Sequence, residues 1–110
     1  MKITKMTAAA VIGLGLLTTS AMADAAKGQK IYQKKMKEVC AKSGAVFAAS
    51  HAQMEWEIAK EEGKLTDMMI QECPAGADFL KSDKFQNKFK QHLYDFVYEF
   101  AKDSGNIPSC

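Results

Sequence analysis

With 110 residues, the chain is long enough for one domain with one modest hydrophobic core. Its 15 basic residues are all lysine, and 13 acidic residues nearly balance them, which argues against a nucleic-acid-binding domain because such domains carry a clear basic excess. Lysine also lacks the planar fork of arginine, so a site that clamps a phosphate or carboxylate at two points is not favoured.

Residues 1–23 have the three parts of a secretory signal peptide. Two lysines precede an apolar run over 8–17, and a small-x-small cleavage site (AMA) stands directly before Asp24. The apolar run is shorter than the ~20 residues that a helix needs to cross a bilayer. We therefore expect export to the periplasm, cleavage before Asp24, and no membrane attachment of the chain after signal cleavage.

Cleavage would change the charge balance of the exported chain. Removing 23 of the 110 residues leaves 87, and removing two of the 15 lysines leaves 13 against 13 acidic residues. Residues 24–110 are thus expected to form a nearly neutral, single helical domain, with a short C-terminal tail over 103–110. A neutral domain again speaks against a nucleic-acid partner.

Hydrophobic spacing and capping residues predict four helical segments, over 27–42, 50–62, 66–73 and 82–102. A capping box formed by Ser50 and Gln53 would begin the second segment, Thr66 the third, and Ser82 or Asp83 the fourth. Residues 45–49 fit either a short helix or a buried connector.

No segment alternates between apolar and polar residues as a strand would, so the predicted fold class is all-α, a small four-helix orthogonal domain. In the last segment, apolar side chains at helical spacing predict one buried face at the centre of the core: Phe85, Phe89, His92, Phe96 and Phe100. Leu93 and Val97 widen this face, and Tyr94 and Tyr98 form a second stripe.

The first segment carries Gly28, Tyr32 and Met36 at four-residue intervals. With the aromatic-rich stretch from Leu93 to Phe100, this pattern resembles class I cytochromes c. In that family, a glycine and an aromatic residue of the N-terminal helix pack against aromatic residues of the C-terminal helix. The resemblance implies a cytochrome c-like arrangement of the first and last helices.

The chain departs from that family where haem is attached. The resemblance places Met36 and Val39 at the two cysteine positions of the C-x-x-C-H motif, and Cys40 at the position of the proximal histidine. Covalent attachment needs both thiols and an axial imidazole. We therefore expect no covalently bound haem, no other cofactor and no metal site.

Non-covalent haem would still require a pair of axial ligands, and His51 and His92 are the weak candidates, with a methionine (Met36, Met54, Met68 or Met69) as the second ligand. Each also has an ordinary structural interpretation. His51 falls in the first turn of a helix and is expected to face water, whereas His92 lies on a core face. The methionines suit gaps in a hydrophobic core.

Three cysteines in an oxidising compartment allow one disulfide and leave one thiol over. A bridge between Cys40 and Cys73 would join the ends of two helices, and we favour it among the three possible pairings. Cys110 would then be a free thiol on the tail, as in proteins that carry sulfur or exchange disulfides. Alternatively, Cys110 pairs with Cys40 or Cys73 and holds the tail in place.

The sequence contains no H-E-x-x-H, C-x-x-C or glycine-rich phosphate motif, and we expect no enzymatic activity. The resemblance implies an accessory or interaction subunit of a periplasmic redox or sulfur system, with a periplasmic protein as partner. Two alternatives stay open: an electron carrier with atypical haem binding, and a small periplasmic stress chaperone. The glutamates of segment 50–62 are expected to form a solvated face.

Overall fold

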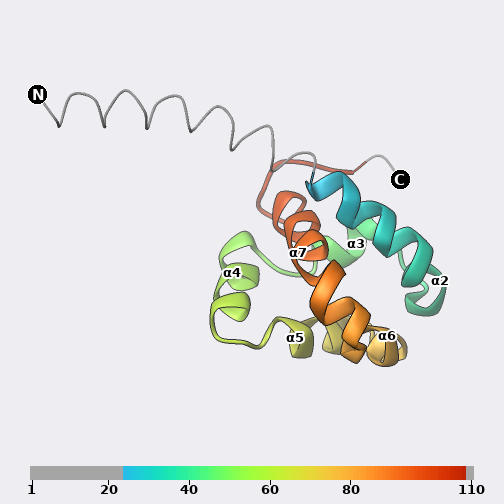
Figure 1. Ribbon diagram of the computed structural model, residues 1–110. Coiled ribbons are helices and arrows are strands. Elements are labelled where there is room, and N and C mark those ends of the chain that lie inside the picture. Colours follow the sequence, from blue (N-terminus) through green and yellow to red (C-terminus); the bar gives the residue numbers. More distant parts are fainter. Residues whose placement is uncertain (1–23, 109–110) are drawn as a thin grey trace, which may run out of the picture.

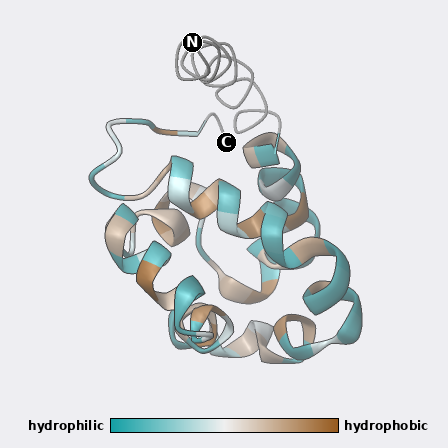
Figure 2. Ribbon diagram, turned by 60° about the vertical axis from the view of Figure 1, so that its left-hand side comes forward, coloured by the Kyte–Doolittle hydropathy of each residue, from teal (hydrophilic) through white to brown (hydrophobic). Residues whose placement is uncertain are grey.

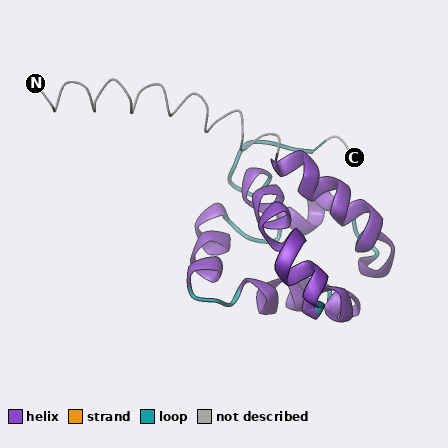
Figure 3. Cartoon of the chain, viewed as in Figure 1, coloured by secondary structure: helices purple, strands orange, loops and turns teal. Residues whose placement is uncertain are grey.

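The computed structural model describes residues 24–108, and all regular secondary structure in that range is helical, which confirms the predicted all-α class. The first helix spans 24–35. It is followed by α2 (Lys37–Cys40), α3 (Gly44–Ala48), α4 (Gln53–Glu61), α5 (Leu65–Glu72), the 3-10 turn η1 (Pro74–Gly76), α6 (Ala77–Lys81), the π-helical segment η2 (Phe85–Phe89) and α7 (Lys90–Glu99) (Figures 1 and 3). The predicted signal peptide, 1–23, and Cys110 lie outside the described residues.

The helix α7 lies at the centre of the fold, where α3 and α4 pack against it and the first helix crosses it (Figure 1). Gly28 marks the crossing point, since a Cβ atom there would lie 2.0 Å from the carbonyl oxygen of His92 and 2.7 Å from Cβ of Phe96. Glycine therefore permits a backbone approach that any side chain would prevent. One turn later, Tyr32 stacks on Phe96 with ring centroids 6.2 Å apart.

The core is built from aromatic and aliphatic side chains that these helices bury together. Trp56 of α4 is fully buried, and its indole Nε1 donates a hydrogen bond to the carbonyl of Ala48, 3.0 Å away. The Tyr32 hydroxyl likewise donates to the carbonyl of Lys42 at 2.8 Å. Figure 2 shows hydrophobic and hydrophilic residues interleaved along the helices, the pattern of amphipathic helices around a shared core.

The four predicted segments are helical, but their boundaries and caps differ from the predictions. The first is interrupted at Met36, and the last ends at Glu99. Short helical elements also occur between the predicted segments, so a four-helix description is incomplete. Residues 45–49 fall largely within one of them, α3.

The predicted capping box at Ser50 is wrong, because α4 begins two residues later. Ala52 is the N-cap, and its backbone N–H donates to the Glu55 carboxylate at 2.7 Å. The Ser50 hydroxyl instead donates to the carbonyl of Phe47, at the end of α3. This hydrogen bond satisfies a carbonyl at the end of α3, whereas the N-cap position of α4 falls at Ala52.

The other two predicted caps have different outcomes. Thr66 lies inside α5, which begins at Leu65, and its hydroxyl accepts a hydrogen bond from Gln86. The cap at Ser82 is confirmed, since its hydroxyl accepts from the backbone N–H of Phe85 at 3.2 Å. No helix within residues 24–108 is both long enough and apolar enough to cross a membrane.

The π-helical segment η2 changes which side chains of the last helix face the core. Phe85 and Phe96 are fully buried, whereas Phe89, His92 and Phe100 are only partly buried. A π turn holds more residues than an α turn, so it shifts the register of the helix beyond it. The predicted face is confirmed in part. Phe85, Leu93, Phe96 and Val97 are fully buried, Phe89 and Phe100 pack against the core while partly buried, and Tyr94 of the second stripe is buried as well.

Candidate functional site

Cys40 and Cys73 form a disulfide with their Cα atoms 5.2 Å apart, in agreement with the favoured pairing. The bridge joins the end of α2 to the residue directly after α5. Gly76 lies against it, since a Cβ there would lie 3.1 Å from Sγ of Cys73 and 3.8 Å from Cε of Met36. The position that the resemblance compares with a haem attachment site thus holds a disulfide and the fully buried Met36 side chain.

His51 is not the water-facing residue that its position in the sequence predicts. Its Nε2 lies 3.0 Å from the Glu72 carboxylate and its Nδ1 lies 3.5 Å from that of Glu55, and only 20% of the side chain is exposed. The edge of the ring also meets Trp56, with centroids 5.0 Å apart. Both ring nitrogens therefore face carboxylates, which leaves neither of them directed at a haem iron.

The Glu55 carboxylate is held mainly by the backbone. The hydrogen bond from the N–H of Ala52 lowers the pKa of Glu55, and the positive charge of Lys102 and the contact with His51 lower it further. His92 lies elsewhere, on α7, with Nδ1 3.9 Å from the Asp24 carboxylate.

The methionine candidates do not share one site. Met36 and Met69 are fully buried in the core, Met68 is partly buried, and Met54 is largely exposed on α4. The first two fill core volume, as the ordinary structural interpretation expects.

The most distinctive surface feature is a groove of about 330 Å³ between the first helix and η2, lined by Lys30, Ile31, Lys34, Lys35 and Phe89. We call it the basic groove. Its three lysines are exposed, while Ile31 and Phe89 are partly buried and provide an apolar floor. A fourth cation lies beside the floor, with Nζ of Lys84 5.8 Å from the centroid of the Phe89 ring.

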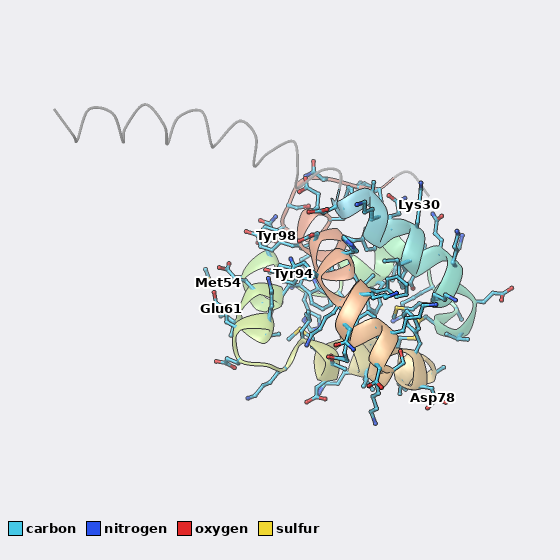
Figure 4. The ribbon with its side chains drawn as sticks, in the orientation of Figure 1. Lys30, Met54, Glu61, Asp78, Tyr94 and Tyr98 are labelled. Carbon is cyan, nitrogen blue, oxygen red and sulfur yellow. A yellow bond between two sulfur atoms is a disulfide. The ribbon has the colours of Figure 1, made fainter. Side chains whose placement is uncertain are left out.

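The charge on α4 has the opposite sign. Glu55, Glu57 and Glu61 are exposed there, and Figure 4 shows Lys30 and Glu61 on opposite sides of the molecule in that view. Burial, and then the Glu57 carboxylate, raise the pKa of Tyr94 to about 12, so its hydroxyl stays neutral next to this acidic helix. The near-zero net charge of residues 24–108 therefore hides two surfaces of opposite sign.

The basic groove was not predicted from the sequence, because the net charge of a chain does not show where its lysines lie on the surface. The available signal was the spacing of lysines along the first helix, at 27, 30 and 34, which places them on one face. The apolar floor had no such signal, because Phe89 was assigned to the buried face of the last helix.

The groove combines mobile ammonium groups with an apolar floor. This pairing suits an acidic segment of a protein partner that also presents an apolar side chain, since charges guide the encounter and the buried apolar contact stabilises the complex. Comparisons with protein-family models, with curated proteins and with solved structures find no match to this chain.

Proposed function

We propose that this chain is an exported, non-enzymatic interaction protein that docks through its basic groove onto an acidic surface of a periplasmic protein partner. The observation that carries the proposal is the grouping of Lys30, Lys34 and Lys35 around the apolar floor formed by Ile31 and Phe89. A purely solvated lysine face has no need of such a floor.

The positive charges of the groove lysines are also not balanced by neighbouring carboxylates of the described residues. Within residues 24–108, no carboxylate lies within ion-pairing distance of Lys30, Lys34 or Lys35. Like charges on neighbouring helical turns repel one another. An acidic partner would relieve this repulsion and would be attracted over a distance of about 10 Å, the range of electrostatic interaction at 0.1 M salt.

The proposal extends to the kind of system that the partner belongs to. The close approach at Gly28 and the stacking of Tyr32 on Phe96 are compatible with a relative of class I cytochromes c. The disulfide of Cys40 and Cys73 at the compared haem position favours a haem-less relative. On this basis, we infer an accessory role in a periplasmic redox or sulfur system.

Site-specific photo-crosslinking tests the docking surface. A crosslinking residue replaces Ile31 in the groove or, as a matched control, Ile58, which is exposed on the acidic helix α4. In cells that produce the protein, we expect one discrete crosslinked protein from position 31 and none from position 58. Crosslinks of the same partner from both positions, or none from position 31, would refute the docking surface.

A further inference from the structure

A cluster of three side chains that can each bind a metal ion lies away from the basic groove. It consists of Asp24, His92 and Asp95. Asp24 is the first described residue of the first helix, and the other two residues lie one turn apart on α7. One ligand atom from each residue, a ring nitrogen or a carboxylate oxygen, lies within 4.8 Å of the other two. Asp24 and His92 are 68 residues apart in the sequence, so no short sequence motif predicts the cluster.

The polar groups of this cluster are incompletely satisfied. Nδ1 of His92 is buried and has no hydrogen-bond partner, because the 3.9 Å to the Asp24 carboxylate exceeds hydrogen-bonding distance. Buried polar atoms are nearly always paired in folded proteins, so an unpaired ring nitrogen beside the Asp24 carboxylate requires an explanation.

The two carboxylates also lie close to each other, since one oxygen of Asp24 and one of Asp95 are within 4.8 Å. Asp95 accepts a hydrogen bond from the side-chain amide of Gln91 at 2.9 Å. A bound cation would offset the repulsion between the two carboxylates and would pair with the ring nitrogen at the same time.

His51 provides an instructive comparison, because it also has two carboxylates beside it. There, Glu55 faces Nδ1 and Glu72 faces Nε2, so the two carboxylates lie on different edges of the ring. One ion cannot contact a ring nitrogen and both of those carboxylates. At His92, in contrast, one ring nitrogen and one oxygen of each carboxylate all lie within 4.8 Å of one another.

We propose that Asp24, His92 and Asp95 bind a divalent transition-metal ion, with Nδ1 of His92 and one oxygen of each carboxylate as ligands. An imidazole with two carboxylates suits Cu²⁺ or Zn²⁺ better than Mg²⁺ or Ca²⁺, which favour sites made only of oxygen. Among the first-row ions, Cu²⁺ binds most tightly to a given set of nitrogen and oxygen ligands. The site is independent of the docking function.

The test uses the full chain and Cu²⁺ alone, with affinity measured by titration calorimetry and the ligands identified by pulsed electron paramagnetic resonance. We expect binding of one Cu²⁺, with the signature of one coordinated imidazole. His92→Gln should remove that signature and weaken binding by ~10-fold or more. Replacing a residue that only hydrogen-bonds to a metal ligand already lowers metal affinity by at least that factor. Asp95→Asn should weaken binding and keep the signature.

His51→Gln is the matched control, because it removes the other histidine and its two carboxylate contacts. We expect it to leave both the affinity and the imidazole signature unchanged. Circular dichroism establishes that each variant is folded. An imidazole signature that persists in His92→Gln or disappears in His51→Gln would overturn the proposal, as would equal affinity in all variants.

Discussion

At Gly28 the backbones of the first helix and α7 are in close contact. The methyl group of Gly28→Ala would lie 2.0 Å from the carbonyl oxygen of His92, which is backbone and cannot rotate away. Overpacking of this kind costs up to ~3 kcal/mol. We expect Gly28→Ala to lower the free energy of unfolding by about that amount in urea denaturation, although alanine is intrinsically the better helix former.

Gly63→Ala separates this steric effect from the general cost of replacing a glycine. Gly63 has a φ of +73° and nothing within 4 Å of the added Cβ, so the substitution introduces backbone strain without a clash. Left-handed backbone costs an alanine ~1 kcal/mol. If Gly28→Ala were no more destabilising than Gly63→Ala, the close helix crossing would be wrong.

The raised pKa of Asp95 predicts that the stability of the folded chain depends on pH. Its pKa in the folded chain is raised, chiefly by burial, so the folded chain binds more protons than the unfolded chain between the two pKa values. Stability therefore falls as the pH rises through that window. Without metal, we expect Asp95→Asn to be more stable than the wild type at pH 7, with the difference vanishing below the ordinary pKa of aspartate. Urea midpoints at pH 3 and 7 measure this, and a variant less stable at pH 7 would contradict it.

Asp24 would connect the proposed metal site to the predicted signal cleavage. Cleavage before this residue would give it a free α-amino group, which together with its own carboxylate can chelate a metal ion in a six-membered ring. We expect the processed protein to bind Cu²⁺ more tightly than the 110-residue chain, as measured by competition titration. The intact mass of the exported protein establishes the cleavage point, and equal affinity of the two forms would exclude the amino group as a ligand.

Among the elements, α2 and α5 are joined by the disulfide of Cys40 and Cys73, which are 33 residues apart in the sequence. Closing a loop of this length stabilises the folded state by ~4 kcal/mol in the chain-entropy account. We expect reduction to lower the free energy of unfolding by about that amount in urea denaturation. A Cys110→Ser background prevents thiol exchange, and an unchanged midpoint under reducing conditions would contradict a structural role.

The elements also show how far local sequence signals extend. Gly63 and Pro74 end helices where their backbone preferences predict, and Ser82 caps the last helix. Ser50 is not the cap of α4, because it lies in the connection between α3, which ends at Ala48, and α4, which begins at Gln53. The π-helical segment η2 likewise has no signal in the periodicity, which assumes one constant angle per residue.

At the scale of the whole molecule, the candidate sites could be predicted only in part. Three cysteines and the expected export predict one disulfide but leave three pairings open, and helical spacing places lysines on one face of the first helix. The floor of the groove required the packing of the first helix beside η2, and the cluster of Asp24, His92 and Asp95 required the crossing of the first helix over α7. Both depend on contacts between residues far apart in the chain.

Because charge is separated across the molecule, the proposed docking would depend on where lysines lie and not on how many there are. Lys30 and Lys34 line the basic groove, whereas Lys64 and Lys102 are exposed elsewhere. Reversing either pair to glutamate changes the net charge equally. A variant pair matched in this way therefore distinguishes local recognition from a general electrostatic effect.

The most direct test of the docking function combines these variants with the crosslinking residue at position 31. The measurement is the yield of the crosslinked partner in periplasmic extract from each double variant. We predict that Lys30→Glu with Lys34→Glu abolishes the crosslink and that Lys64→Glu with Lys102→Glu retains it. Equal yields from the two double variants would contradict a docking surface in the basic groove.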